Sequence, residues 1–266
     1  MKQVICIKWG TKYGPEYVNR LYGMVARNIT PPFRLYCFTD DGAGIRPEVQ
    51  IRPLPDFEYT APTNTLGKWP KSRLWGDLGD VTGVVLFVDL DCVITGNLDP
   101  FFSFGDPEDT VLARNLSTPF EKLGQTSIYR MQVGRLAPLQ QMFQADPQGI
   151  ADTYRFEQRF VTRNAPGGIR FWPRGWVTHF RLQSVPHFPL NYVMSPRIPR
   201  GSRVVIFAGR INPHDAVNGR WGDGDPARTP LDHLRAAFDG RRRHGLSRHL
   251  RHYLRPASWI ARHWRE

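Results

Sequence analysis

The chain has 266 residues, a formal net charge of +12 and three cysteines. This length suits one large α/β domain, with or without a tail, and it can bury a sizeable core without disulfides. Three cysteines cannot all pair internally, and each lies in an apolar run, so we expect a cytoplasmic protein with free, buried thiols at Cys6, Cys37 and Cys92. No segment approaches the roughly 18 consecutive apolar residues of a transmembrane helix, so we expect no bilayer-spanning segment.

The first 40 residues alternate strand and helix patterns. Apolar runs at Val4 to Ile7 and at Leu35 to Phe38 are typical of buried strands. Between them, Glu16 to Arg27 has apolar side chains at helical spacing and follows Gly14-Pro15, a typical helix start. This order predicts an α/β fold, a Rossmann-like and mostly parallel sheet flanked by helices.

The pattern becomes less regular after Asp40. A short strand is predicted at Val49 to Arg52 between loops, and Leu66 to Leu78 is a weaker helix candidate that Pro70 interrupts. A further helix is predicted around Arg155 to Thr162. Further strands are predicted at Val84 to Val88, Val111 to Ala113 and Val204 to Phe207.

Two aspartates follow the most apolar of these strands. Val84 to Val88 is apolar throughout, as in a strand buried on both faces, and Asp89 and Asp91 come directly after it. Open α/β sheets bind ligands at the carboxyl ends of their strands, and an Mg²⁺ or Mn²⁺ ion held by carboxylates takes further ligands from substrate phosphates. The motif therefore predicts a metal site for a phosphorylated substrate; the alternative is a pair of solvated charges. Asp223-Gly224-Asp225 has the same spacing but no strand before it, and is typical of a turn.

Four further segments can be grouped with this motif. Ile5 to Gly14 is a strand running into a glycine-containing loop with two lysines and two aromatic residues, suited to stack a base and meet phosphates. The aspartate motif extends through Ile94 to Phe101, Arg155 to Thr162 offers an acid and an amide on a helix, and Val204 to Pro213 is a strand followed by glycine and basic residues. Together they resemble the nucleotide-sugar glycosyltransferases of the GT-A fold, nearest to the glycogenin-like and lipopolysaccharide-galactosyltransferase-like group of family eight. The resemblance covers roughly residues 3–215.

The resemblance implies a metal site and a donor site. In such enzymes the aspartate pair, here Asp89 and Asp91, binds Mn²⁺ or Mg²⁺ bridging the donor diphosphate; the alternative role for Asp89 is to hold the ribose. The loop after the first strand holds the nucleoside, commonly uridine. The nucleoside contacts implied in this way are Lys8, Trp9, Gly10 and Tyr13.

Further positions are carried over from the same resemblance. Similar enzymes place a basic donor contact before the aspartates, and the alternative for the lysine and arginine found here is an amphipathic helix face. The family's Asp-Gln pair is represented by a Glu-Gln pair, which keeps the charge and adds one methylene. The implied donor contacts are Lys71, Arg73, Gly209 and Arg210. The implied catalytic residues are Glu157, Gln158 and Arg114.

The chain departs from the family's pattern at Ala208. The group usually has His-Gly after this strand, with the imidazole as third metal ligand, whereas this chain reads Phe207-Ala208-Gly209. His214 is the nearby imidazole and the candidate replacement ligand, with a structural role as the alternative.

Positive charge concentrates at the end of the chain. From Pro226 onward there are ten arginines against three acidic residues. A basic amphipathic helix with tryptophans is typical of an anchor on an anionic membrane surface; the alternative is a helix docked on the body. We therefore expect a GT-A-like catalytic domain over residues 1–226 and a basic tail over residues 227–266. The expected apolar face comprises Leu246, Leu250, Tyr253, Leu254, Trp259, Ile260 and Trp264.

We interpret the chain as a metal-dependent hexosyltransferase that moves a sugar from a nucleotide-diphosphate sugar, in first place a UDP-sugar, to an acceptor hydroxyl. Retention of configuration is implied by the resemblance. The expected setting is synthesis of a cell-surface or capsular polysaccharide or a glycolipid, with a glycan or lipid-linked acceptor, at the inner face of the membrane.

Two other functions remain as alternatives. A haloacid-dehalogenase-like Mg²⁺-dependent phosphatase would use Asp89 as nucleophile and Asp91 as acid/base group. A nucleic-acid-binding protein would interleave basic and aromatic residues over its body, whereas here they concentrate in the tail, so no nucleic acid is expected as a partner.

Overall fold

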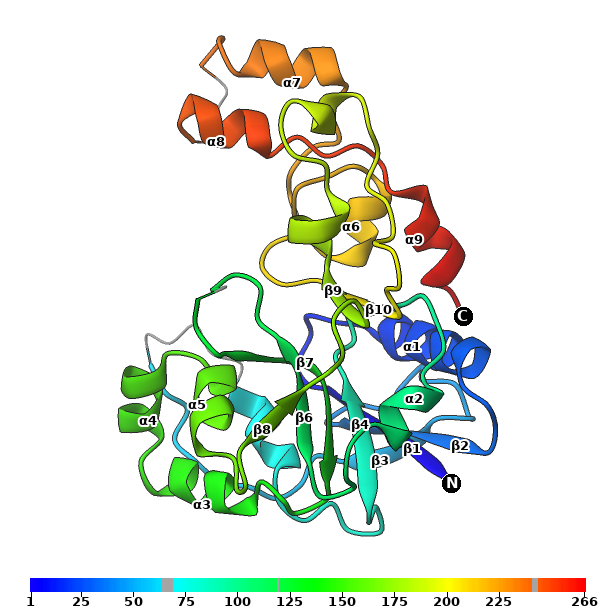
Figure 1. The fold of residues 1–266 in the computed structure, drawn as a ribbon, viewed down its shortest axis with the longest axis vertical. Coiled ribbons are helices and arrows are strands. Elements are labelled where there is room, and N and C mark those ends of the chain that lie inside the picture. The colour runs from blue at the N-terminus through cyan, green and yellow to red at the C-terminus, as the bar shows by residue number, and fades with distance from the viewer. Residues whose placement is uncertain (64–68, 119, 241–243) are drawn as a thin grey trace. The chain divides into compact units, whose positions relative to one another are not determined.

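The computed structural model describes residues 1–63, 69–118, 120–240 and 244–266, and Figure 1 labels its elements. The chain forms two compact units. Unit 1 comprises Met1–Leu90 and Asn97–Arg174, and unit 2 comprises Asp91–Gly96 and Gly175–Glu266. The domain boundary expected between residues 226 and 227 thus lies inside unit 2, and the chain passes from one unit to the other between the two aspartates of the motif.

A seven-stranded sheet forms the centre of unit 1, in the order β3-β2-β1-β4-β7-β6-β8 (Figure 1). The first four of these strands run parallel, β7 is antiparallel to both of its neighbours, and β6 is parallel to β8. The predicted α/β class is confirmed. The strands are β1 (Lys2–Lys8), β2 (Phe33–Thr39), β3 (Gln50–Pro53), β4 (Val84–Val88), β6 (Thr110–Arg114), β7 (Gly124–Gln132) and β8 (Ile169–Phe171).

The middle of this sheet is built from strands that are apolar on both faces. Residues 4–7 of β1 and residues 85–88 of β4 are all buried, which a strand covered on both sides requires. The helix α1 (Pro15–Asn28) connects β1 to β2 and starts at a proline, as predicted. The sequence pattern does not predict β7 or β8, because the first half of β7 is polar although it is buried.

A short 3₁₀ helix and four α-helices complete unit 1. The 3₁₀ helix η1 (Trp69–Leu74) replaces the longer helix predicted over residues 66–78, because Pro70 lacks the amide hydrogen that a longer helix needs; residues 66–68 lie outside the described residues. Trp69 stacks on Phe143 of α3, with ring centroids 4.6 Å apart, and this contact fixes η1 in the core. The α-helices are α2 (Asp99–Ser103), α3 (Ala137–Ala145), α4 (Pro147–Tyr154) and α5 (Glu157–Asn164).

Unit 2 has a three-stranded sheet in the order β5-β10-β9, in which β10 is antiparallel to β5 and parallel to β9. Its strands are β5 (Val93–Ile94), β9 (Val177–His179) and β10 (Val204–Ile206). Its helices are α6 (Pro213–Val217), α7 (Pro230–Ala236), α8 (Leu246–Arg251) and α9 (Ser258–His263), with a π-helical turn η2 (Phe180–Ser184) and a 3₁₀ turn η3 (Leu190–Tyr192).

The aromatic side chains of the predicted tail pack inside unit 2. Trp259, Ile260 and Trp264 are buried, and α9 contacts α6 and β5. Tyr253 and Leu254 are buried as well, so most of the apolar face that the sequence assigned to a membrane is covered by protein, as in the docked-helix alternative, while Leu246 stays exposed. Arg241, Arg242 and Arg243, which belong to the predicted basic tail, lie outside the described residues.

Two expectations about composition can be compared with the structure. Cys6, Cys37 and Cys92 are buried and form no disulfide, as predicted. In the described part of the chain no helix is both long enough and apolar enough to cross a bilayer.

Candidate active site

The candidate site of unit 1 lies where the carboxyl end of β4 meets the start of β7. The antiparallel register pairs Val88 with Ile128, so the residues before Ile128 lie beside the residues that follow β4. The backbone N–H of Asp89 donates a 2.8 Å hydrogen bond to the carbonyl oxygen of Ser127. This pairing holds Asp89 at the end of the sheet, where the sequence predicted a ligand site.

Lys71 of η1 forms an ion pair with Asp89. Its Nζ lies 2.7 Å from Asp89 Oδ2 and also donates to the carbonyl oxygen of Thr126 at 3.4 Å. The Lys71 side chain is 7% exposed and the Asp89 side chain 18% exposed, so both charges are largely removed from water. A buried pair of this kind is weak evidence for stability, because desolvation offsets the attraction. Its position at a strand end therefore favours a functional role.

The environment of Asp89 contains opposing effects. Burial raises the pKa of the Asp89 carboxyl, while the charge and hydrogen bond of Lys71 and a hydrogen bond from Ser127 act in the opposite direction; the net direction is upward. The nearby carboxylate of Glu157 raises the pKa of Asp89 further. Two carboxylates and one ammonium thus share a poorly solvated space, which an additional cation would stabilise.

Glu157 enters this cluster from the first turn of α5. It is buried, and its Oε1 accepts a 3.1 Å hydrogen bond from the Thr126 hydroxyl of β7. Beside it, the Gln125 side chain bonds the backbone N–H and the hydroxyl of Ser127, each at 2.6 Å. The polar start of β7 therefore organises the cluster from within the sheet.

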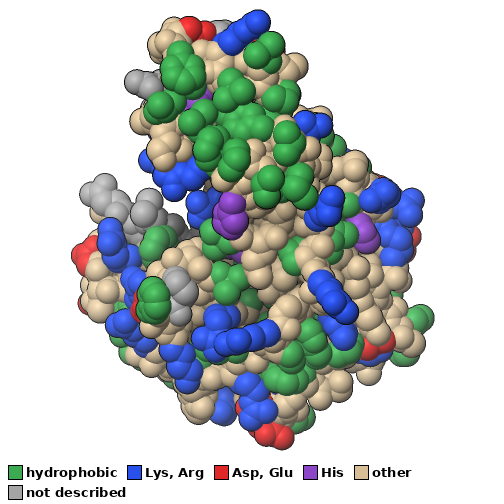
Figure 2. Space-filling view, turned by 45° about the horizontal axis from the view of Figure 1, so that its top comes forward, with side chains coloured by type: hydrophobic (Ala, Val, Ile, Leu, Met, Phe, Trp, Pro, Cys, Tyr) green, Lys and Arg blue, Asp and Glu red, His purple; other side chains and the backbone are tan. Residues whose placement is uncertain are grey.

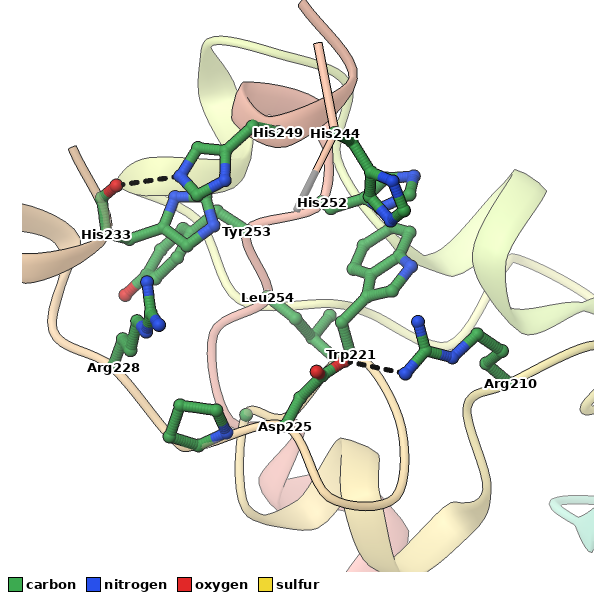
Figure 3. A pocket seen from close by; sticks show the side chains of 12 residues that line it. Arg210, Trp221, Asp225, Arg228, His233, His244, His249, His252, Tyr253 and Leu254 are labelled. Atoms are coloured by element: carbon green, nitrogen blue, oxygen red, sulfur yellow. Dashed lines mark hydrogen bonds and ion pairs between the residues drawn. The ribbon is translucent and has the colours of Figure 1, made fainter. Parts of the chain in front are cut away.

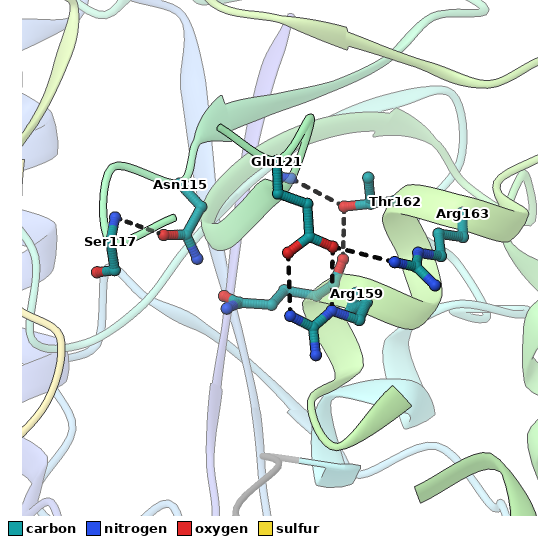
Figure 4. Close-up of polar contacts among 8 residues, drawn as sticks. Asn115, Ser117, Glu121, Arg159, Thr162 and Arg163 are labelled. Carbon is teal, nitrogen blue, oxygen red and sulfur yellow. Dashed lines mark hydrogen bonds and ion pairs between the residues drawn. The ribbon is translucent and has the colours of Figure 1, made fainter. Parts of the chain in front are cut away.

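The position of α5 is fixed by a clamp centred on Glu121 (Figure 4). The two carboxylate oxygens of Glu121 accept from Arg159 Nε and Nη2 at 3.2 and 3.0 Å, and Arg163 adds a contact at 3.1 Å. Hydrogen bonding from Arg159 is the main cause that lowers the pKa of Glu121. Thr162 accepts from the Gly124 N–H at 2.9 Å, which ties α5 to the start of β7. The clamp thus keeps Glu157 beside Thr126.

The end of β1 supplies the predicted nucleoside loop. Lys8 is buried and donates from Nζ to the carbonyl oxygen of Asp41 at 2.9 Å. Gly10 has φ +59°, a conformation that favours glycine, and its N–H donates to Asp40 at 2.9 Å. Trp9 packs against the core, and the Tyr13 hydroxyl accepts from Lys12 at 2.7 Å. This loop follows β1, the strand next to β4, so it belongs to the same edge of the sheet as Asp89.

Asp91 belongs to unit 2, where it precedes β5. Val93 pairs with Val205 and Ile94 with Val204 in antiparallel register, so the start of β5 and the end of β10 lie at the same end of this strand pair. Asp91 precedes β5 by two residues, and Ala208, where the resemblance lacks a histidine, follows β10 by two residues. Gly209 follows with φ +101°, which a residue with a side chain rarely adopts.

Other predicted residues of unit 1 have different partners. Arg73 donates to the carbonyl oxygen of Pro55 at 2.9 Å, and Arg114 is exposed, with its guanidinium 4.3 Å from the centroid of the Phe171 ring. Gln158 is half-buried on the first turn of α5. The structure therefore gathers Lys71, Asp89 and Glu157, and no recorded contact joins Arg73 or Arg114 to them.

Two predicted residues of unit 2 also lie elsewhere. Arg210 pairs with Asp225 at 3.3 Å. His214 lies on α6, with Nε2 3.4 Å from Asp215 Oδ1. Within the described residues, His214, Asp215 and Asp223 form the one group of three side chains close enough to share a metal ion. Asp215 is already used as the buried capping residue of α6 and as the partner of Arg220 at 3.1 Å. The role of His214 as a third ligand beside Asp91 stays a prediction.

The residues at the strand end fit a divalent cation. Asp89 and Asp91 offer the hard oxygen ligands that Mg²⁺ and Mn²⁺ prefer. The raised pKa of the Asp89 carboxyl shows that Lys71 alone does not offset its burial. A cation bound there would stabilise the ionised carboxylate.

Comparisons with solved structures agree with this architecture. A galactosyltransferase, LgtC, solved with donor and acceptor sugar analogues has 12% sequence identity and a TM-score of 0.54, over 86% of this chain and 93% of that chain. An active-site mutant of LgtC gives the same identity and TM-score over 88% and 95%. The glycosyltransferase GlyE of Streptococcus pneumoniae TIGR4 gives 9% and 0.52, over 100% of this chain and 66% of that chain.

The chain has a GT-A glycosyltransferase fold. The bifunctional glycosyltransferase WbbM also matches, with 10% identity and a TM-score of 0.51 over 80% of this chain and 46% of that chain. No family model matches the sequence, and no curated protein matches it. At these identities the similarity establishes the fold, and the activity has to be argued from the side chains.

Sequence reasoning gave Thr126 and Ser127 no firm role, although both contact the cluster. The available signal was a polar run, Gln125-Thr126-Ser127, directly before the apolar residues 128 and 129. A buried strand with a polar start marks a strand end where polar groups are needed.

Proposed function

We propose that the protein is a glycosyltransferase that moves a sugar from a nucleotide-diphosphate sugar, in first place a UDP-sugar, to an acceptor hydroxyl. The observation that carries this proposal is the buried pair of Lys71 and Asp89 at the end of β4, inside a GT-A fold. A phosphorylated donor explains why a lysine, a strand-end carboxylate and a second carboxylate are kept together at the expense of desolvation.

Each residue of the cluster has a task in this reaction. The leaving nucleoside diphosphate carries negative charge, and the Lys71 ammonium is positioned to stabilise that charge without reorganisation. Lys8 and the loop after β1 would hold the nucleoside end of the donor. Glu157, fixed by Thr126 and by the clamp on α5, would face the sugar and its acceptor; Gln158 and Arg114 remain candidates for contacts with the sugar. Retention of configuration is part of the proposal.

Asp89 and Asp91 would hold Mn²⁺ or Mg²⁺. When bound, such an ion supplies positive charge for the diphosphate of the donor. Lys71, whose ammonium lies 2.7 Å from Asp89, would contact a donor phosphate held at the same place.

The proposed acceptor is a glycan or a lipid-linked glycan at the inner face of the membrane, in synthesis of a surface polysaccharide or glycolipid. Support comes from α7 and the two residues after it, where Leu231, Leu234 and Phe238 are 55%, 37% and 76% exposed at a helical spacing. Figure 2 shows hydrophobic side chains gathered on the face of unit 2 turned to the viewer. Arg235 lies among them in the sequence and would meet anionic headgroups. These residues replace the buried tryptophans as the proposed membrane contact.

The two alternative functions are not favoured. The solved structures that match the chain are glycosyltransferases, and none of those described above is a phosphatase or a nucleic-acid-binding protein.

Release of a nucleoside diphosphate from a panel of UDP-, GDP- and dTDP-sugars tests the proposal, with Mn²⁺, with Mg²⁺ and with chelator. We expect metal-dependent release that Asp89→Asn lowers by about 10²-fold or more, because a preorganised charge is lost. The matched control is Asp152→Asn, at an exposed aspartate of α4, which should keep full activity. Hydrolysis of phosphomonoesters without turnover of any nucleotide sugar would instead establish the phosphatase.

Flotation with anionic vesicles tests the membrane contact. Replacing Leu234 and Phe238 together by serine should release the protein from vesicles. Met142→Ser, which changes an exposed apolar side chain of unit 1, is the control and should not release it. Equal flotation of both variants would remove α7 as the contact.

A further inference from the structure

Unit 2 contains a pocket of about 90 Å³ that the proposed transfer reaction does not use (Figure 3). Residues of α7 and α8 and of the loop after α6 line it. Four of the eight histidines of the chain meet there. This concentration of nitrogen donors in one cavity calls for a physical explanation.

One wall of the pocket is a stacked pair of buried histidines. The rings of His233 and His249 lie 4.1 Å apart between centroids and 14° from parallel. His249 Nε2 donates to the carbonyl oxygen of His233 at 2.9 Å, and His233 Nδ1 lies 2.8 Å from the Tyr192 hydroxyl. These bonds fix both rings, so the wall is formed before any ligand arrives.

The opposite wall carries a second stack. His252 lies on Trp221, with centroids 4.4 Å apart and planes 11° from parallel, and His244 meets His252 edge-on at 5.6 Å. No hydrogen bond to a ring nitrogen of His244 or His252 is recorded in the described part of the chain. These imidazoles are therefore placed to donate N–H groups to a ligand.

The charge in the pocket is positive and incompletely balanced. Asp225 is the one carboxylate among the lining residues, and it already pairs with Arg210 at 3.3 Å. Arg228 has neither an ion-pair partner nor a hydrogen-bond partner among the described residues, and Figure 3 shows it extending toward His233.

Burial and the neighbouring positive charges lower the pKa values of two histidines in the pocket. Burial, followed by the neighbouring His249 and Arg228, lowers the pKa of His233 to about 4. Burial and then Arg248 lower the pKa of His252 to about 4. Both imidazoles are neutral at neutral pH, and the pocket lacks an anion that would complement its charge.

We propose that this pocket binds a phosphate-bearing group, a phosphomonoester or a diphosphate, through Arg228 and the N–H groups of His252 and His244. A guanidinium matches phosphate oxygens with two parallel hydrogen bonds, and neutral imidazoles add directed donors. The stack of His252 on Trp221 provides an apolar surface for whatever the phosphate is attached to. The proposal is independent of the transfer reaction, since every residue it uses lies in unit 2 outside the aspartate motif.

Other ligand classes fit less well. A metal ion requires several ligand atoms around one point, and no set of three of these histidines comes close enough among the described residues. A single carboxylate would be satisfied by one guanidinium fork and would leave the histidine donors unused.

Calorimetric titration of the full chain with inorganic pyrophosphate, in chelator to remove metal-dependent binding, tests the proposal. Arg228→Gln should weaken binding about tenfold or more, because one charge-assisted pair is lost. Arg197→Gln, exposed in unit 2 but outside the pocket, is the matched control and should stay within about twofold. His252→Gln, a second variant, should also weaken binding, and thermal unfolding checks that each variant is folded.

Binding to two kinds of anionic vesicle distinguishes a lipid phosphate from a soluble one. Vesicles with phosphatidic acid present a phosphomonoester, and vesicles with phosphatidylglycerol present a phosphodiester. Binding to pyrophosphate in solution supports a soluble phosphate source, and binding to phosphatidic acid vesicles alone supports a lipid source. In either case Arg228→Gln has to weaken the binding. The proposal is overturned if neither pyrophosphate nor either kind of vesicle binds, or if Arg228→Gln and Arg197→Gln weaken binding equally. It is also overturned if glucuronate binds as tightly as pyrophosphate, or if Zn²⁺ binds in place of all of them.

Discussion

Lys71 Nζ lies 2.7 Å from Asp89 Oδ2, although 18 residues separate them in the chain. The contact exists because Trp69 anchors η1 in the core and the register of β4 and β7 fixes the end of β4. A lysine two residues after a core tryptophan is thereby held at the edge of the sheet, where a donor phosphate would bind. The same short helix carries Arg73, which points to a different partner, and this difference allows a matched test.

Lys71→Met and Arg73→Met should therefore have different effects on turnover. We expect Lys71→Met to lower nucleoside-diphosphate release by about 10²-fold, because the ammonium stabilises the leaving group, and to leave Asp89 without its ion-pair partner. Arg73→Met removes a bond to the Pro55 carbonyl oxygen and should change turnover less than about threefold. The measurement is kcat/KM for the preferred donor. Equal losses in both variants would place Arg73 in the donor site after all.

Glu121→Gln should loosen α5. The carboxylate accepts from two arginines, so its loss should reduce the free energy of unfolding by about 1 kcal/mol, near the upper end for partly exposed pairs. Because α5 carries Glu157, turnover should fall as well. Denaturant unfolding and donor turnover measure the two effects. Glu48→Gln, which breaks the exposed pair with Arg46, is the control and should change neither.

The sequence predicted the parts of the fold that depend on local apolar patterns. The runs at β1, β2 and β4 and the proline start of α1 were read correctly, because continuous apolar runs and helix caps are local signals. The antiparallel strand β7 was not predicted from the sequence. Its residues Gln125 to Ser127 are polar, and they become buried only through contacts with Asp89 and Glu157. Burial of that kind depends on tertiary structure.

The candidate site was predicted unevenly for the same reason. Asp89 follows a strand, so its position could be inferred from the chain alone, whereas the choice between Lys71 and Arg73 depends on the direction of each side chain on η1. The predicted tail, residues 227–266, shows most clearly what a local sequence pattern does not determine. Trp259 and Trp264 fit a membrane-binding pattern, but the pattern does not distinguish a membrane from the core of unit 2.

Unit 2 should lose stability in mild acid. Burial is the main cause that lowers the pKa of His179 and of His233 to about 4, whereas an unfolded chain has the ordinary value of about 6.5. Between these values the unfolded state binds more protons, so stability is present above pH 6.5 and falls as the pH drops toward 4. The expected loss is on the order of 1 to 3 kcal/mol for each histidine.

Denaturant unfolding at pH 7, 6 and 5, followed by tryptophan fluorescence, measures this loss. His179→Phe removes one of the titrating groups, whose Nδ1 has no hydrogen-bond partner among the described residues, and should flatten the pH dependence. A free energy of unfolding that is constant between pH 7 and 5 would contradict the assignment of both histidines as buried and neutral.

The last prediction concerns Ala208, which follows β10 at the end of the strand pair where Asp91 precedes β5. An imidazole introduced there would be at the end of the same strand pair as the aspartate, and imidazole binds Mn²⁺ more readily than Mg²⁺. Ala208→His should therefore tighten Mn²⁺ binding in the presence of donor by about tenfold and change Mg²⁺ binding less. His214→Ala provides the comparison, because His214 lies beside Asp215 on α6. Titration with Mn²⁺ followed by electron paramagnetic resonance gives the Mn²⁺ affinity, and displacement of bound Mn²⁺ by Mg²⁺ gives the Mg²⁺ affinity. If His214→Ala weakens Mn²⁺ binding strongly while Ala208→His leaves it unchanged, His214 is the third ligand and Ala208 does not face the ion.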